Sequence, residues 1–403
     1  MTSLTAPDRV EDSGVSKLRF SAWAGIFVFG IVMAILGAIL PSLVDRFGFS
    51  ASMAGSLFLT MNFGMLVTTL SFGPLVDRFG FKALLAVSAL LVAGAFLLLA
   101  RASSYGLVLA AAGVLGLGGG GLNGGANALT SDIHEGEKRG AALNILGIFF
   151  GFGALSIPFL IGTLRELLGL RWILQLATLL SLVPFIIYVV LRFPKAKQAR
   201  GFPIREAAAI VRDPLLWLCA FLLFFQSGNE FTVGGWISSY LQRTFGLGAG
   251  PAAMVLAGYW AALMAGRLLS ARLIRMWGGG KLVLLSAGLA FAAAALLRFS
   301  PSGPLAAVAA GALGFGFAAI YPTTLAVVGE RFPAFTGTAF SVAIAVGLVG
   351  GMISPWLAGT FAQSAGLRAG LTVPLFNCAM VFFLQLILVR SPKAPREDIE
   401  KHP

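Results

Sequence analysis

Charged side chains are scarce in this sequence: they make up 11% of its 403 residues, whereas soluble domains carry about 25%. Hydrophobic residues account for 58% of the chain, and its mean hydropathy is +0.90. A surface with so few charges cannot face water over most of its area. The composition therefore excludes an ordinary soluble domain and predicts an integral membrane protein in contact with the lipid bilayer.

Cysteine and histidine are also rare, with two of each. Cys219 and Cys378 both lie within apolar runs, which excludes a disulfide framework. His134 and His402 do not supply the spacing of a metal site, and the glycine-rich runs do not follow a strand as a nucleotide-binding loop would. We find no catalytic constellation. We expect no metal and no cofactor, and a protein that is not an enzyme.

Long apolar runs are what the sequence has in abundance. A spanning helix needs about 20 apolar residues. Twelve such stretches cover residues 20–44, 52–76, 82–101, 105–131, 140–165, 171–192, 214–242, 251–275, 281–299, 304–329, 335–363 and 369–390. The pattern predicts an all-α membrane protein with twelve transmembrane helices.

Most connections between these stretches are short, but one covers residues 192–213 and divides the chain nearly in half. We predict an N-terminal six-helix bundle over 1–192, a cytoplasmic linker loop over 193–213 and a C-terminal six-helix bundle over 214–403.

The distribution of Lys and Arg predicts the orientation. Only seven of the 29 fall on the side opposite the N-terminus, namely Arg46, Arg101, Arg165, Arg171, Arg243, Arg298 and Arg368. Because cytoplasmic loops carry the excess of positive charge, we expect both termini and the long loop in the cytoplasm. The net charge of +13 is then a topology signal, and we expect no nucleic-acid partner.

The two halves of the sequence resemble each other. A shift of 197 positions pairs Gly119 with Gly316, Gly140 with Gly337, Ala142 with Ala339, Gly153 with Gly350 and Pro158 with Pro355. With an even number of helices in each half, such a repeat runs parallel, about an axis along the membrane normal. That is the arrangement of the two bundles of major facilitator transporters.

A specific motif adds to this. Residues 73–82 read GPLVDRFGFK and resemble the signature of the major facilitator superfamily between its second and third helices. The resemblance implies two six-helix bundles, alternating access, and a gate built from charged residues: Asp77, Arg78, Lys82 and Arg139. We expect Asp77 at the N-terminus of the span 335–363, where exposed backbone N–H groups favour an anion. The chain is expected to be a monomer in a plasma membrane, the bacterial inner membrane.

Further stretches are similar to the fucose permease branch of sugar:cation symporters: GLGGGGLNGGANALTSD, LNILGIFFGFGALSIP, GNEFTVGGWISSYL and GFGFAAIYPTTLAVVGERFP. The resemblance implies sugar uptake driven by a cation. One departure concerns the acidic residues that this branch has within its first and fourth helices. Here the span 20–44 has none in its interior, and the fourth offers Asn123 and Asn127 instead.

Glu230 is the only acidic residue deep within any of the twelve spans. A charge at the bilayer centre costs about 2.5 to 3.5 kcal/mol on the most lenient scale, so such residues face a cavity or a partner and mark transport pathways. Proton coupling needs a carboxylate that can titrate. We therefore predict that Glu230 carries the coupling proton; the alternative is a structural Glu bonded to polar neighbours.

Polar and aromatic side chains near the middle of other spans complete a candidate substrate site. Amides match vicinal hydroxyls, and aromatic rings offer an apolar face to the C–H surface of a sugar. The predicted substrate-binding residues are Asn62, Asn123, Asn127, Gln226, Asn229, Glu230, Trp236, Tyr259, Trp260 and Tyr321. Each has a structural interpretation as well, since asparagines often join helices and aromatics often pack.

Arg267 lies about five residues on the cytoplasmic side of the centre of its span. It could pair with Glu230 in one conformation, but an arginine at this depth more often reaches to the interface or holds a helix end. We favour that second interpretation.

Three functional classes follow. The first is a secondary active transporter that couples a proton, or alternatively sodium, to the symport of a sugar or related polar small molecule. The second is a polyspecific drug/proton efflux antiporter, which would need a large apolar cavity. The third is a non-transporting sensor on the same fold, for which we expect an added soluble domain. The amides in the spans 52–76, 105–131 and 214–242 favour the first class.

Overall fold

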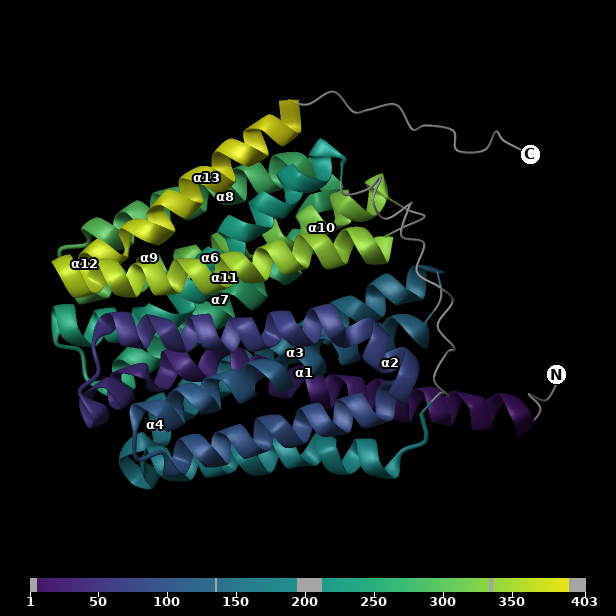
Figure 1. Ribbon diagram of the computed structural model, residues 1–403. Helices are drawn as coiled ribbons and strands as arrows, with labels where there is room; N and C mark the ends of the chain where they lie inside the picture. Colours follow the sequence, from purple (N-terminus) through teal and green to yellow (C-terminus); the bar gives the residue numbers. More distant parts are fainter. Residues whose placement is uncertain (1–5, 135, 194–211, 333–335, 391–403) are drawn as a thin grey trace.

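The computed structural model describes residues 6–134, 136–193, 212–332 and 336–390, which are helical apart from short connections (Figure 1). The helices are α1 (Ala6–Phe47), α2 (Ala51–Arg101), α3 (Tyr105–Asp132), α4 (Gly136–Val190), α6 (Pro214–Phe245), α7 (Ala249–Trp277), α8 (Gly279–Phe299), α9 (Gly303–Phe317), α10 (Ile320–Arg331), α11 (Thr336–Ala365), α12 (Leu367–Gly370) and α13 (Thr372–Arg390).

Eleven segments of the described chain are long and apolar enough to cross a membrane. One of them, Ile145–Val190, has 46 residues, about twice the length that a bilayer requires. It is interrupted at Gly169, whose φ of 74° is a left-handed conformation that favours glycine. With this break the count agrees with the twelve spans predicted. Gly80, at φ 76°, separates the two spans of α2 in the same way.

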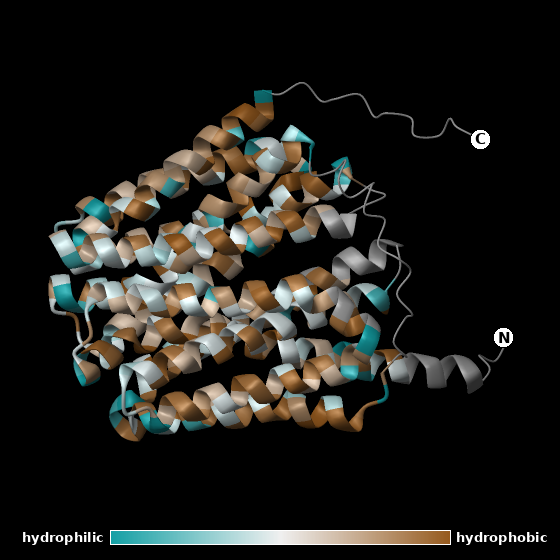
Figure 2. Cartoon of the chain, in the orientation of Figure 1, coloured by the Kyte–Doolittle hydropathy of each residue, from teal (hydrophilic) through white to brown (hydrophobic). Residues whose placement is uncertain are grey.

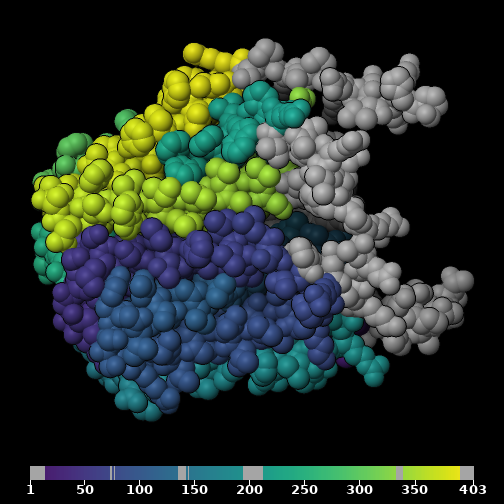
Figure 3. All heavy atoms as spheres, viewed as in Figure 1, coloured from purple at the N-terminus to yellow at the C-terminus, as the bar shows by residue number. Residues whose placement is uncertain are grey.

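The helices form two bundles, and the fold is an all-α membrane fold as predicted. Helices α1 to α4 pack on one another, and α6 to α13 form the second group (Figure 1). On the face seen in Figure 3 the two halves of the chain occupy separate areas and meet where α2 lies along α11. The two bundles also contact each other through α4 with α7 and α1 with α6. Hydrophobic residues predominate along the middle of the helices, and hydrophilic residues gather toward their ends (Figure 2). The exact domain limits remain a prediction, because residues 194–211 of the predicted linker lie outside the described residues.

The internal repeat is visible in the packing of equivalent glycines. A Cβ on Gly153 of α4 would meet the carbonyl oxygen of Phe27 in α1, and a Cβ on Gly350 of α11 would meet the carbonyl oxygen of Phe224 in α6. The two phenylalanines stand 197 positions apart, as the two glycines do. Both halves therefore bring two helix backbones into contact at the same place, where only glycine fits.

Two helices differ from the predicted spans. Helix α1 begins at Ala6 rather than near residue 20, because apolar length marks the membrane crossing and not the end of a helix. The predicted span 304–329 is divided into α9 and α10 at Ala318 and Ala319. Pro322 lies in the first turn of α10 and has no N–H to donate to the carbonyl four residues earlier, which weakens the helix at this break. The break places the end of α9 beside the middle of α6.

Candidate functional site

Glu230 lies at the midpoint of α6 and is buried, with 8% of its surface exposed. Gln226, one turn earlier on the same face, donates a hydrogen bond from Nε2 to Glu230 Oε1 at 2.9 Å. The same Nε2 is 3.5 Å from the carbonyl oxygen of Phe317, at the end of α9. The helix break therefore supplies a backbone acceptor that orients Gln226 toward the carboxylate.

This arrangement offsets part of the cost of the carboxylate. A hydrogen bond to a charged group is worth about 1.5 to 3 kcal/mol, comparable to the cost of about 2.5 to 3.5 kcal/mol for a charge at the bilayer centre. Among the described residues, the Oε1 atom of Gln226 is buried and has no hydrogen-bond partner. The pair is thus tolerated in the membrane but retains an acceptor for another group.

Aromatic residues of α7 line the next part of the site. Tyr259 and Trp260 are both buried, with ring centroids 5.2 Å apart. Trp260 also meets Phe150 of α4 edge-on at 6.1 Å, so it spans the boundary between the two bundles. The Tyr259 hydroxyl and Trp260 Nε1 are buried without a hydrogen-bond partner in the described part of the chain. Two predicted site residues therefore present unsatisfied polar atoms, as a substrate site would.

Arg267 of α7 is part of the same cluster, contrary to the interpretation that we favoured from the sequence. Its charge acts on Glu230, Tyr259 and Tyr321, and its Cζ lies 5.5 Å from the ring centroid of Phe150. The side chain is half-buried and points to the other bundle instead of the helix end. A single Arg in an apolar span could not show this from sequence, because its partners lie on α6, α10 and α4.

Tyr321 also belongs to this cluster. It is half-buried in the first turn of α10, and the charges of both Glu230 and Arg267 act on it. The structure thus brings Gln226, Glu230, Tyr259, Trp260 and Tyr321 of the predicted set together with Arg267.

Asn62 and Trp236 occupy a different part of the boundary, between α2, α6 and α11. Asn62 is buried and donates from Nδ2 to the Phe58 carbonyl at 2.9 Å, while its Oδ1 faces Gly351 and has no hydrogen-bond partner within the described ranges. Trp236 Nε1 donates to the Pro355 carbonyl at 3.1 Å. Trp236 is therefore satisfied within the protein, and a substrate-binding role for it stays a prediction.

The remaining asparagines lie apart from Glu230 in their contacts. Asn127 Nδ2 donates to the backbone oxygen of Asn123 at 2.9 Å and to its Oδ1 at 3.0 Å, so these two pair along α3. Asn123 is half-buried and Asn127 exposed. Asn229 is buried, and neither its Nδ2 nor its Oδ1 has a hydrogen-bond partner among the described residues. Their part in binding remains a prediction.

The predicted gate residues are resolved only in part. Arg78 and Lys82 are exposed, and the Arg78 Cζ lies 5.3 Å from the ring centroid of the neighbouring Phe79. The side chains of Asp77 and Arg139 lie outside those that the structure describes. The gate therefore stays a prediction.

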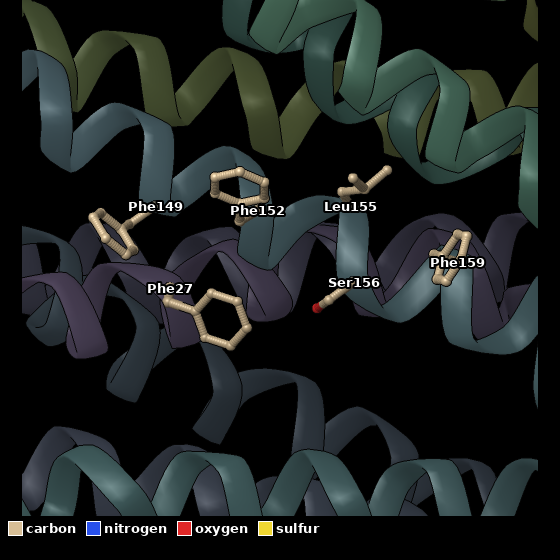
Figure 4. A pocket seen from close by; sticks show the side chains of 6 residues that line it. All are labelled: Phe27, Phe149, Phe152, Leu155, Ser156 and Phe159. Carbon is tan, nitrogen blue, oxygen red and sulfur yellow. The ribbon is translucent and has the colours of Figure 1, made fainter.

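A separate cavity of about 470 Å³ lies between α1 and α4. Figure 4 shows its lining side chains: Phe27, Phe149, Phe152, Leu155, Ser156 and Phe159. Phe152 and Phe159 are exposed, so the cavity opens at the surface. Its lining is almost entirely apolar and includes none of the predicted site residues, so it is distinct from the cluster around Glu230.

Two helical bundles related by a repeat, with unsatisfied polar atoms and a carboxylate buried at mid-membrane depth beside their boundary, define a multi-pass membrane protein of the transporter class. The family model described as Major Facilitator Superfamily matches residues 22–303. The chain belongs to the major facilitator superfamily. It is a membrane transporter and not an enzyme.

Comparison with individual proteins agrees with this. The Protein TsgA homolog of Erwinia tasmaniensis is 22% identical over 392 residues, which cover 96% of each chain. The solved structure of a D-xylose-proton symporter is similar with a TM-score of 0.76 and 16% identity, covering 94% of this chain and 98% of the other. That of a point mutant of the nucleoside transporter NupG gives 0.75 and 14%, covering 92% and 99%. At these identities the solved structures support the fold alone.

Proposed function

We propose that this transporter couples the movement of protons to the uptake of a sugar or related polar small molecule, with Glu230 as the group that carries the proton. The observation that carries the proposal is the position of Glu230: a buried carboxylate at the midpoint of α6, bonded to Gln226 and within reach of the Arg267 charge. A carboxylate there is costly in the membrane, and a transport pathway is the usual reason for one.

Its surroundings support a polar substrate. Gln226 Oε1, the Tyr259 hydroxyl and Trp260 Nε1 are buried and have no hydrogen-bond partner among the residues that the structure describes. A ligand with several hydroxyl groups would satisfy both donors and acceptors of this set. The likeness in fold to a proton symporter of D-xylose and to a nucleoside transporter is consistent with this. The sequence resemblance to the fucose permease branch also supports a sugar as the substrate of the proposed function.

The proposal includes the placement of the protein. We infer a plasma membrane, the bacterial inner membrane, with both termini on the cytoplasmic side, from the uneven distribution of Lys and Arg. We also propose that the chain acts as a monomer.

The test replaces Glu230 by Gln, which keeps the size and a hydrogen-bonding oxygen but cannot release a proton. In proteoliposomes, a gradient of one pH unit drives at most about tenfold accumulation by one coupled proton, since tenfold corresponds to about 1.4 kcal/mol. Glu230→Gln should lose this accumulation and only equilibrate or exchange the substrate. Glu166→Gln, at an exposed carboxylate near the end of a span, is the matched control. Accumulation by Glu230→Gln equal to that of the parent would refute the role. If accumulation by the parent protein required a sodium gradient, sodium and not the proton would be the coupling ion.

A second candidate is a drug/proton efflux antiporter. The cavity between α1 and α4 favours it, because four phenylalanines and a leucine in its lining suit a lipophilic ligand. The cavity does not include Glu230, however, so a ligand there would not contact the proton-carrying group. Thermal stabilisation of the purified protein by lipophilic cations and not by sugars, polyols or carboxylates would favour this function over the first.

A further inference from the structure

Arg267 is a cation inside a membrane span that contacts no anion among the described residues. Its Nε is buried and has no hydrogen-bond partner, and its guanidinium lies against the ring of Phe150. The group has five N–H donors and stays protonated. Charged residues at such depth pair with one another or with something in the pathway. Arg267 therefore lacks an anionic partner, and a negatively charged substrate would supply one.

Glu230 is the anion whose charge reaches Arg267, but it bonds to Gln226 and forms no ion pair with the arginine. The positive charge of the guanidinium is consequently balanced by Glu230 without direct contact. Its N–H groups remain open for direct contact with an anion. The Glu230 carboxylate and a second carboxylate at Arg267 would repel each other, whereas a protonated Glu230 would leave the arginine charge uncompensated.

We propose that the substrate carries one carboxylate, so that the transporter moves a sugar acid together with one proton, with Arg267 binding the carboxylate of the substrate. This inference rests on the proposed function and names the chemical class of its substrate. The proton enters on Glu230 from one side and leaves to the other with the substrate. The loaded site holds neutral Glu230, the arginine cation and the substrate anion. The empty site holds the Glu230 anion and the same arginine.

The net charge of the site is therefore zero in both forms. Coupling follows because the carboxylate of the substrate replaces the negative charge that Glu230 loses on protonation. The substrate binds when the proton is bound, and the carrier returns empty once both have left. The hydroxyl groups of the substrate would meet the Tyr259 hydroxyl, Trp260 Nε1 and Gln226 Oε1, which lack partners in the same cluster.

Other titratable groups around Glu230 do not replace it. Tyr259 of α7, Tyr321 of α10 and Cys378 of α13 are neutral in their ordinary state near pH 7. Helices α9 and α11, which also pack against α6, have no titratable residue, and α1 has such residues only toward its ends. Glu230 and Arg267 are thus the two charged groups that the exchange requires.

The first test asks whether transport moves net charge. The probes are radiolabelled D-gluconate and D-galactonate, each compared with its neutral sugar, D-glucose or D-galactose, in proteoliposomes and in protein-free vesicles. One arm imposes a pH gradient at zero membrane potential, and the other imposes an inside-negative potential without a pH gradient. We expect accumulation of a sugar acid with the pH gradient, up to about tenfold per unit, and none with the potential alone.

The outcomes separate the two proposals. Accumulation of a neutral sugar under both gradients would overturn the carboxylate inference and leave proton-coupled sugar transport standing. Accumulation of a sugar acid by the potential as well as the pH gradient would overturn the electroneutral exchange. Proton-driven accumulation of none of the probes would overturn both proposals.

The second test uses variants of Arg267. Arg267→Gln should weaken gluconate or galactonate binding by roughly ten- to a hundredfold, the value of a charge-assisted hydrogen bond. Arg267→Lys, which keeps the charge, should restore part of it. Arg272→Gln, an exposed arginine of the same helix, should bind as the parent does. Unchanged binding by Arg267→Gln would overturn the assignment. If Arg267→Gln does not fold, the comparison of the pH-gradient and membrane-potential arms on the parent protein still tests whether the substrate carries a carboxylate.

Discussion

The α1–α6 boundary offers a sharp test of what holds the two bundles together. A Cβ on Gly37 of α1 would meet the carbonyl oxygen of Gly234 in α6 and come within 3.0 Å of the Gly235 Cα. Eight residues further along α1, Arg243 donates to Asp45 across the same two helices at 2.8 Å, with side chains 47% and 68% exposed. Glycine packing and an ion pair thus both hold α1 against α6, and opening the Asp45 end of the bundles must separate both contacts.

The two contributions differ in size. Gly37→Ala places a methyl group against backbone that cannot move aside, and such overpacking costs about 1 to 3 kcal/mol. The cost falls on the closed arrangement, so the population in which this end is open should rise roughly 5- to 150-fold. Asp45→Asn removes an exposed ion pair worth about 0.2 to 1 kcal/mol, which changes the population by at most about fivefold.

The assay measures the separation of the bundles at this end. Spin labels on cysteines at Ser103 and Pro301, both exposed and one on each bundle, report the distance distribution by pulsed electron paramagnetic resonance. Gly37→Ala should enlarge the long-distance population much more than Asp45→Asn does. Gly94→Ala, where a Cβ would meet nothing within 4 Å, is the control. The reasoning fails if Asp45→Asn has the larger effect, or if Gly37→Ala behaves like Gly94→Ala.

Three further predictions concern stability, gating and orientation. Asp213 accepts hydrogen bonds from the Leu215 N–H at 2.8 Å and from Arg331 at 3.0 Å. Asp213→Ala should therefore lower the Tm more than Asp213→Asn, because an asparagine can still cap the N-terminus of α6. Equal Tm values for the two variants would show that the cap does not contribute to stability. Asp77→Asn should shift the population toward the inward-open state and slow transport with little loss of substrate affinity; normal turnover with unchanged accessibility on both faces would contradict a gate. A cysteine placed in the loop 194–212 should react with an impermeant maleimide only from the cytoplasmic face, and labelling in intact cells from outside would reverse the orientation.

Much of the architecture was available from the sequence because it depends on local or periodic features. The apolar runs marked the membrane crossings, and Gly80 and Gly169 fall in the short connections where α2 and α4 break. The repeat was detectable because glycines at helix contacts tolerate no substitution by a larger side chain. Gly153 and Gly350 are therefore separated by the same number of residues as Phe27 and Phe224, whose carbonyl groups they contact.

The candidate site was predictable only where its members are close in sequence. Gln226 and Glu230 are four residues apart on one helix, which places them on one face whatever surrounds them. Arg267 was assigned to the helix end, because nothing in its own helix indicates Glu230, Tyr321 or Phe150 as neighbours. Pro322 alone could not indicate the break between α9 and α10, because other prolines, such as Pro158 and Pro355, lie inside continuous helices. Nor could the sequence show that the Phe317 carbonyl would lie beside Gln226.

By itself, then, the sequence determined the membrane location, the twelve helices, the repeat and the isolation of one carboxylate, since each follows from composition or from spacing along the chain. The tertiary structure decided which helix faces meet. That choice depends on the fit of small residues between helices far apart in sequence, such as Gly37 against Gly234. It also decided which polar atoms are left without partners, and so turned an arginine and a carboxylate from separate helices into one charged cluster.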